Sequence, residues 1–278
     1  MSIFVFLAVL GAALLHATWN ALVKVGTNRV GTMMVLSGVQ GLIGLAVVAT
    51  QAMPAAAVWP WLIASGVIHS AYKLFLTFAY EHGDLSRVYP LARGTAPMIT
   101  LIVGALWLGE VVRTSEALGI LVLGLGILML ARGVWTSGES RKMLPFAFGA
   151  ACATAGYTLV DGLGARVAGN ATQFVGWLFV LDGIIFAAAM LGLRGRGALP
   201  GKGRIWLLGS LGAAASYASY AVAVWAMTLA PIALVAALRE TSILFAVVIG
   251  WITFGERMTR AKAISVALIA TGVVLTRL

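Results

Sequence analysis

The sequence predicts an all-α integral membrane protein, with ten transmembrane helices arranged as two inverted five-helix repeats around a central cavity. Three observations predict this class. The 278-residue chain is 61% hydrophobic and only 10% charged, whereas a soluble domain carries about 25% charged residues. Its mean hydropathy is +1.00, and apolar segments long enough to cross a bilayer recur along its whole length. Finally, the second half of the chain repeats the first.

The repeat is clearest when residues 88–130 are compared with residues 234–276. VYPLARGTAPMITLIVGALWLGE in the first stretch recurs, 146 positions later, as LVAALRETSILFAVVIGWITFGE. Equivalent positions include Arg93 and Arg239, Gly104 and Gly250, and the Gly-Glu pairs at 109–110 and 255–256. This register indicates a duplicated unit, and an arginine inside each apolar run indicates function because a charge is costly there.

Ten apolar segments of roughly 20 residues are candidate spans. They cover residues 3–24, 31–51, 57–80, 86–108, 115–132, 145–164, 172–193, 205–228, 232–254 and 260–277. The longest polar break, TSGESRK at residues 136–142, divides the segments into five and five. The sequence therefore predicts a first repeat at residues 1–135, a cytoplasmic linker at 136–144 and a second repeat at 145–278.

The loop charges predict the orientation of the spans. An odd number of spans per repeat means that the second repeat crosses the membrane in the opposite sense. Of 19 Lys and Arg residues, Lys73, Arg93 and Arg239 lie inside spans; of the other 16, 13 fall on one side and 3 on the other. The positive-inside rule places the basic side in the cytoplasm and both termini in the periplasm. We therefore attribute the net charge of +10 to topology and not to a nucleic-acid partner.

A family resemblance rests on features that occur in both halves. Each half has a proline or arginine in an apolar helix, then the Gly-Glu pair, then a final span with glycines, at Gly119, Gly124 and Gly126 in one half and Gly272 in the other. This pattern resembles the EamA branch of the drug/metabolite transporter superfamily over essentially the whole chain, with bacterial aromatic amino acid exporters the most similar. The second half departs from the pattern in having Ala236 where the first has Pro90.

Polar and aromatic residues inside the predicted spans recur at helical spacing, so each group shares one helix face. The candidate substrate-binding residues are His16, Trp19, Asn20, His69, Tyr72, Lys73, Tyr80, Tyr89, Tyr157, Asp182, Ser216, Tyr217 and Tyr220. Aromatic rings stack on the apolar part of a solute, a cation binds its carboxylate, and hydroxyls fix its orientation. We therefore expect a cavity for an amphipathic organic solute.

The two arginines are candidate gating residues. Each lies about seven residues inside its span, which is near 10 Å at 1.5 Å per residue. We expect Arg93 towards the cytoplasm and Arg239 towards the exterior, each closing its own half of the pathway. Asp161 is a possible partner of Arg239, and Glu240 suits a gating and a structural role equally.

Several other polar residues have two interpretations. Asp182 could bind an ammonium group or a proton, and Lys73 could instead extend to the cytoplasmic interface. His16 and His69 could carry protons or simply pack in the interior. We expect Glu110 and Glu256, at span ends, to stabilise helix ends.

These features together favour a secondary transporter of the bacterial inner membrane. The leading hypothesis is export of amino acids or related small metabolites by alternating access, with aromatic amino acids favoured; the alternative is another solute, such as a nucleobase, sugar or small drug. The sequence has no Walker A, H-E-x-x-H or G-x-S-x-G motif, so we expect no enzymatic activity, metal or cofactor. The single Cys152 allows no internal disulfide. Facilitated, exchange and proton-coupled transport stay open, as does the oligomeric state.

Overall fold

The protein is all-helical in a computed structural model that describes residues 1–25, 29–82, 96–131, 141–201, 203–254 and 258–277. The α-helices are α1 (Ile3–Val25), α2 (Arg29–Val48), α3 (Trp59–His82), α5 (Ala96–Trp107), α6 (Thr114–Ala131), α8 (Leu144–Ala168), α9 (Ala171–Arg194), α10 (Arg204–Met227), α11 (Ile232–Arg239), α12 (Ser242–Phe254) and α13 (Arg260–Leu275). Short 3₁₀ turns lie at η1 (Ala56–Val58), η2 (Arg141–Met143) and η3 (Gly195–Ala198). The predicted all-α class is confirmed, and helices cover most of the described part of each predicted span.

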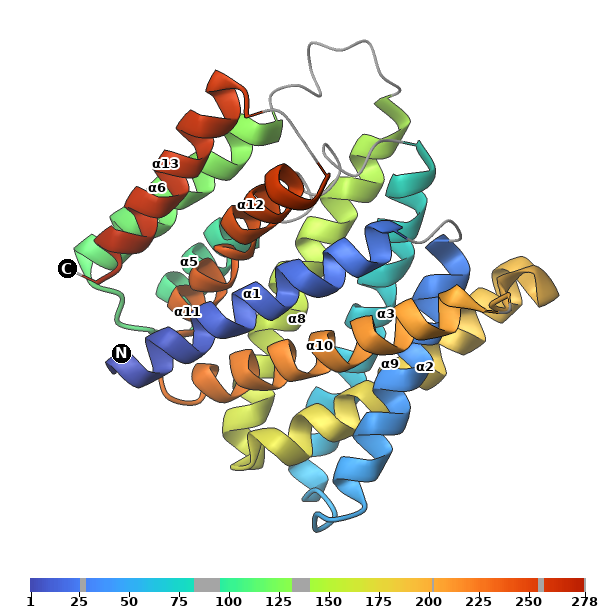
Figure 1. The fold of residues 1–278 in the computed structure, drawn as a ribbon. Coiled ribbons are helices and arrows are strands. Elements are labelled where there is room, and N and C mark those ends of the chain that lie inside the picture. The colour runs from blue at the N-terminus through green and yellow to red at the C-terminus, as the bar shows by residue number, and fades with distance from the viewer. Residues whose placement is uncertain (26–28, 83–95, 132–140, 202, 255–257, 278) are drawn as a thin grey trace.

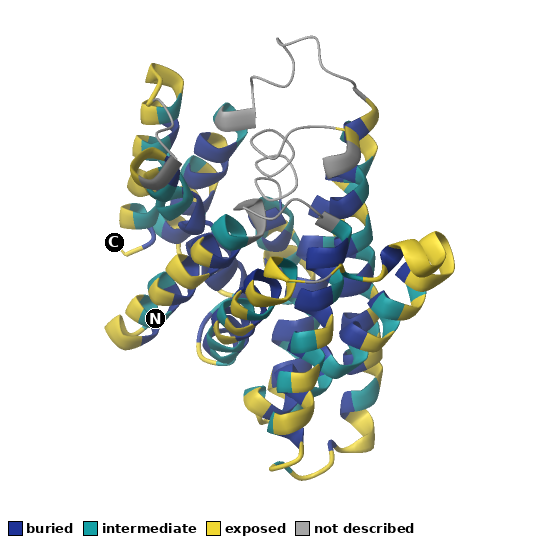
Figure 2. Ribbon diagram, turned by 45° about the vertical axis from the view of Figure 1, so that its right-hand side comes forward, coloured by how far each residue is buried: buried dark blue, intermediate teal, exposed yellow. Residues whose placement is uncertain are grey.

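Six helical stretches are long and apolar enough to cross a membrane. They are Ile3–Leu22, Val30–Val48, Ala56–Ala79, Ala171–Ala198, Arg204–Met227 and Ile232–Ile252, and two shorter apolar helices span Ala96–Trp107 and Thr114–Met129. Large apolar side chains such as Leu42, Ile102, Phe148 and Ile252 are exposed, and exposed residues follow the outer faces of the helices (Figure 2). An apolar outer surface of this extent suits contact with lipid.

Helix pairs drawn from opposite halves of the chain form the body of the protein (Figure 1). The most extensive pairs are α6 with α13, α2 with α9, α3 with α8, and α1 with α10. Exchanging the two halves converts the α1–α10 pair into the α8–α3 pair, and it leaves α2–α9 and α6–α13 as they are. Helix contacts therefore follow an approximate twofold relation between the halves.

Glycines allow the two helices of the α6–α13 pair to approach closely. A Cβ atom on Gly119 would lie 2.6 Å from the carbonyl oxygen of Gly272, and one on Gly126 would lie 3.0 Å from the carbonyl oxygen of Ser265. Residue numbers rise along α6 as they fall along α13, so the two helices are antiparallel. Glycine allows such a close approach of the two backbones because it has no side chain.

Glycines also lie at the close contacts of the α2–α9 pair. A Cβ atom on Gly44 would lie 2.5 Å from the carbonyl oxygen of Gly176, and one on Gly183 would lie 3.0 Å from the carbonyl oxygen of Ser37. Residue numbers rise along α2 as they fall along α9, so these two helices are antiparallel as well. Both pairs of equivalent helices thus cross with opposite chain directions.

The predicted span at residues 232–254 is two helices and not one. α11 ends at Arg239, and α12 begins at Ser242. The N–H groups of Glu240 and Thr241 donate to the carbonyl oxygens of Ala237 and Leu238, three residues back, as in the tight last turn of a helix. α12 is the counterpart of α5, which is described from Ala96 onward. Inside a membrane, irregular backbone is tolerated where it lines a cavity or is buried in protein.

The two ends of the chain lie together (Figure 1). The guanidinium of Arg277 donates a hydrogen bond to the carbonyl oxygen of Met1 at 3.1 Å and lies 5.0 Å from the centre of the Phe6 ring. The start of α1 and the end of α13 therefore lie on the same side of the protein.

Candidate functional site

A cavity of about 50 Å³ lies between seven helices, α1, α2, α3, α8, α9, α10 and α11. It is lined by His16, Trp19, Met33, Leu36, Gln40, His69, Tyr72, Lys73, Tyr157, Phe179, Ser216, Tyr220 and Arg239. Because about 10–15 Å³ of such space holds one water, this conformation has room for a few waters. A metabolite would need a wider cavity.

Stacked and edge-on rings form one wall of the cavity. The imidazole of His69 stacks on the ring of Tyr157 with 4.1 Å between centroids. The rings of Tyr72 and Tyr220 meet this stack edge-on, 5.5 Å from Tyr157 and 5.2 Å from His69 respectively. The sequence predicted all four residues as binding candidates, and the structure brings them together.

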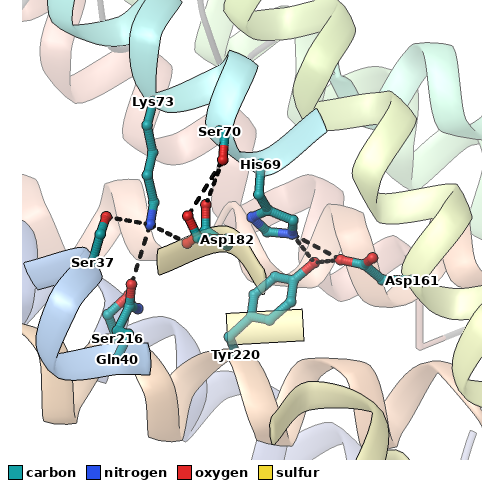
Figure 3. Close-up of polar contacts among 9 residues, drawn as sticks. All are labelled: Ser37, Gln40, His69, Ser70, Lys73, Asp161, Asp182, Ser216 and Tyr220. Atoms are coloured by element: carbon teal, nitrogen blue, oxygen red, sulfur yellow. Dashed lines mark hydrogen bonds and ion pairs between the residues drawn. The ribbon is translucent and has the colours of Figure 1, made fainter. Parts of the chain in front are cut away.

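The Lys73 side chain is fixed by a buried polar network at the cavity wall (Figure 3). Its Nζ forms an ion pair with Asp182 and donates to Ser37 Oγ at 2.6 Å and Gln40 Oε1 at 3.4 Å. The Ser70 hydroxyl donates to Asp182 Oδ1 at 3.3 Å. The side chains of Lys73 and Asp182 are 7% and 0% exposed, so both charges are removed from water and lipid.

This network corrects two expectations. Lys73 does not extend to the cytoplasmic interface, because Asp182 holds its ammonium group inside the protein. Asp182 does bind an ammonium group, but it is that of Lys73, and Asp182 is not among the residues that line the cavity.

A second polar cluster joins His69, Asp161 and Tyr220 (Figure 3). Asp161 Oδ2 lies 2.9 Å from His69 Nε2 and accepts a short hydrogen bond from the Tyr220 hydroxyl, which is itself 3.3 Å from His69 Nε2. Asp161 is fully buried, and its Oδ1 has no hydrogen-bond partner among the described residues. The cluster ties α3, α8 and α10 together beside the cavity.

Arg239 lies at the end of α11, where its guanidinium stands 4.9 Å from the centre of the Tyr220 ring. The expected pairing with Asp161 is not what the structure shows, because Asp161 bonds to His69 and Tyr220 instead. Arg239 also lines a smaller pocket of about 10 Å³ together with Glu240. It therefore stands between two internal spaces at the break in the helix.

The remaining predicted residues lie in different places. Trp19 donates to His16 Nδ1 at 3.2 Å and lines the cavity, whereas Asn20 donates to the His16 carbonyl oxygen and does not line it. Ser216 lines the cavity; Tyr217 is absent from its wall, and its ring contacts Phe179 at 5.1 Å. Tyr89, Arg93, and the side chain of Tyr80 lie outside the described residues.

Sequence reasoning missed Ser37, Gln40 and Phe179. Gln40 offers a signal, since an amide in an apolar helix needs a buried partner, and its Nε2 donates to Ser216 Oγ at 3.0 Å. In an alignment of the two halves that matches Gly41 with Gly183, Gln40 takes the position equivalent to Asp182. Phe179 carries no such signal, because an apolar ring in an apolar helix looks like any core residue.

Glu110 stabilises a helix end, as expected from its position. Its carboxylate accepts hydrogen bonds from the Ile232 N–H, the first of α11, at 2.9 and 3.1 Å, and from Arg166 at 2.9 Å. Arg166 also donates to the carbonyl oxygens of Met227 and Ala230. Glu256 lies outside the described residues.

An apolar helical body with a polar, aromatic-walled cavity enclosed by both halves is the architecture of a membrane transporter. The EamA-like transporter family matches this chain twice, at residues 3–132 and at residues 141–278. The protein belongs to this family, and the predicted resemblance is confirmed. It is therefore a multi-pass membrane protein that transports a small-molecule solute.

One solved structure resembles the protein over almost its full length. It is described as "Crystal structure of protein", and the similarity covers 99% of this chain and 98% of that one, with a TM-score of 0.77 and 21% sequence identity. At this identity the similarity shows the fold alone. No curated protein matches the chain.

Proposed function

We propose that the protein exports amino acids or related small metabolites, above all aromatic amino acids, across the bacterial inner membrane by alternating access. The observation that carries the proposal is the composition of the cavity wall. Seven of its thirteen residues carry an aromatic or imidazole ring, two are cations, and none of the described lining residues is acidic. Rings suit an aromatic side chain, and the cations suit a carboxylate.

Both cations are held in place before any solute arrives. Lys73 is fixed by Asp182, Ser37 and Gln40, and Arg239 lies against the ring of Tyr220. A side chain that is already ordered loses less entropy when it binds. The amide of Gln40 and the hydroxyl of Ser216 add neutral acceptors for an ammonium group. A nucleobase would stack on the same rings but would bring no carboxylate to the two cations, and Arg239 would repel a cationic dye.

We further propose that residues 1–135 and 145–278 are inverted five-span repeats, ten spans in all, joined by a cytoplasmic linker at 136–144 and with both termini in the periplasm. Antiparallel contacts between equivalent helices support the inversion, because a twofold axis in the membrane plane produces them. The adjoining chain ends support an even number of spans. Access would alternate as one repeat moves against the other.

The gating proposal concerns Arg93 and Arg239 as equivalent residues of the two repeats. Arg239 is 5% exposed and lies where α11 gives way to α12, a junction at which a small backbone change would reorient it. We propose that Arg239 closes the periplasmic half of the pathway and Arg93 the cytoplasmic half.

Counterflow into proteoliposomes tests the substrate assignment. Liposomes preloaded with unlabelled solute are given labelled phenylalanine, threonine, uracil or a cationic dye at equal pH on both sides. We expect phenylalanine to exchange fastest and the dye not at all. Dye exchange that equals or exceeds phenylalanine exchange, or wild-type protein without phenylalanine exchange, would refute the assignment.

Matched variants connect the result to the cavity wall. Tyr72→Ala removes a ring from the wall, whereas Phe148→Ala removes a ring that is 63% exposed on the outer surface. Loss of one aromatic contact, at about 0.5–1.5 kcal/mol, should weaken phenylalanine exchange roughly two- to tenfold with a smaller effect on threonine. Phe148→Ala should change neither. Equal losses for both solutes in Tyr72→Ala would contradict stacking at this wall.

A further inference from the structure

The hydrogen bonds around Asp161 determine which nitrogen of His69 carries a hydrogen. The Tyr220 hydroxyl donates its single hydrogen to Asp161 Oδ2. His69 Nε2 lies 2.9 Å from the same oxygen and 3.3 Å from the Tyr220 oxygen. An ionised carboxylate only accepts, and the Tyr220 hydroxyl has no second hydrogen to offer. Nε2 must therefore be the donor, which leaves the lone pair of the neutral ring on Nδ1.

The Nδ1 atom of His69 is on the cavity side of the cluster. His69 lines the cavity, whereas Asp161 is fully buried behind it. Figure 3 shows the second ring nitrogen of His69 on the side of the ring away from Asp161. The neutral ring thus offers a strong acceptor at a wall that has no carboxylate among its described residues.

Among the charged groups around this imidazole, Lys73 has an ionic partner, whereas Asp161 has no Lys or Arg bonded to it among the described residues. Lys73, one turn along α3, is already neutralised by Asp182. Asp161 faces the uncharged rings of Tyr157 and Tyr220 on its own and neighbouring helices, and the nearby cation, Arg239, lies over the Tyr220 ring instead of bonding to the carboxylate. A buried carboxylate without an ionic partner is costly. Protonated His69 would form an ion pair with Asp161, just as Lys73 forms one with Asp182.

We propose that His69 is the proton-binding residue of this transporter, and that a proton on its Nδ1 and the ammonium group of the solute exclude each other. This rests on the proposed function, because it requires a solute with an ammonium group. An ammonium group donates a hydrogen bond to the Nδ1 lone pair. Once protonated, Nδ1 is itself a donor, and the ring is a cation that repels the ammonium group.

Mutual exclusion at one lone pair produces antiport. A proton taken from periplasmic water forms one N–H bond at Nδ1 as the solute leaves, and that bond breaks when the proton is returned to cytoplasmic water. No other bond changes, and one proton enters per solute exported. Asp161 acts as a positioning residue, because it holds Nε2 as the donor and balances the charge of the protonated ring.

Proteoliposomes with an acidic interior test the exchange. With the membrane potential held at zero by potassium and valinomycin, a gradient of one pH unit should drive about tenfold accumulation of labelled phenylalanine at one proton per solute. His69→Gln keeps an acceptor but cannot be protonated, so it should abolish this accumulation and leave slower counterflow that no longer varies with pH. Glu116→Gln, at a carboxylate that accepts the Arg113 N–H outside the cavity, should behave as wild type.

The Asp161→Asn variant tests whether Asp161 positions His69 for proton binding or has only a structural role. Without the carboxylate the protonated ring loses its counter-charge, so the pH at which protons inhibit counterflow should change. A purely structural role would lower the rate without moving this pH. Wild-type counterflow without accumulation, or accumulation only when the exterior is acidic, would overturn the proposal.

Histidine NMR of the purified protein supplies a readout that needs no solute. The chain has three histidines, His16, His69 and His82, which single His→Gln variants assign. We expect the His69 resonances to change with pH and Asp161→Asn to alter that change. If phenylalanine shows no counterflow, the substrate assignment fails, and this titration alone decides the proton site. A His69 signal that does not titrate in the folded protein, or that Asp161→Asn leaves unmoved, would refute it.

Discussion

Breaking the Lys73–Asp182 pair from one side should destabilise the protein strongly. Asp182→Asn leaves the Lys73 ammonium buried, with only neutral acceptors at Ser37 and Gln40. Removing one partner of a buried ion pair costs about 3–5 kcal/mol. At roughly 2 °C per kcal/mol, the lower end of the range for somewhat smaller chains, the Tm should fall by about 6–10 °C. Tryptophan fluorescence during heating of the purified protein in one fixed detergent measures the change.

Replacing both partners separates stability from function. Lys73→Met combined with Asp182→Leu substitutes apolar side chains of similar size for two buried charges, a change that is often neutral or stabilising. The double variant should therefore recover most of the Tm lost by Asp182→Asn, yet transport phenylalanine poorly because a cavity cation has gone. If Asp182→Asn unfolds at the wild-type temperature, or if the double variant is no more stable than the single one, the pair does not stabilise the interior as argued.

Three further predictions concern helix contacts and topology. Gly119→Ala should lower stability by about 1–3 kcal/mol, because its Cβ would meet the Gly272 carbonyl oxygen at 2.6 Å, while Gly38→Ala, with nothing within 4 Å, should have no such effect in the same thermal assay. Glu110→Gln should lower the Tm without altering the pH dependence of transport, because it weakens the bonds to α11 and Arg166; a changed pH dependence would show that Glu110 takes part in coupling. A green fluorescent protein fused to the C-terminus should stay dark in the periplasm while an alkaline phosphatase fusion is active, and the opposite pattern would contradict the loop-charge orientation.

The sequence contained enough information for the helices and for much of the cavity wall. His69, Tyr72 and Lys73 could be predicted because polar and aromatic residues at helical spacing in an apolar span must face protein or solute. Partners were harder, since periodicity gives the face of a helix but not the helix opposite. Asp161 was assigned to Arg239 from depth alone, whereas its neighbours are His69 and Tyr220.

The break at Glu240 and Thr241 was not predicted for a physical reason. Residues 232–254 contain no glycine or proline near the break, so neither of the usual helix breakers marks it. The interruption is recognisable only from the tertiary structure, where the buried Arg239 lies over the Tyr220 ring at the end of α11. Local propensity is a weak guide where tertiary contacts determine the backbone.

The same places in the two halves now carry different chemistry. Gln40 and Asp182 face each other across the α2–α9 crossing, 142 residues apart, and their partners Ser216 and Lys73 are 143 residues apart. A strictly repeated structure would bury two ion pairs at this crossing, with the desolvation cost of four charges. In this protein one pair has charge and the other consists of an amide and a hydroxyl. The cavity wall therefore has a cation on the Lys73 side and only neutral groups on the Ser216 side. The charge distribution of the cavity is therefore asymmetric, although the arrangement of its helices is close to twofold symmetric.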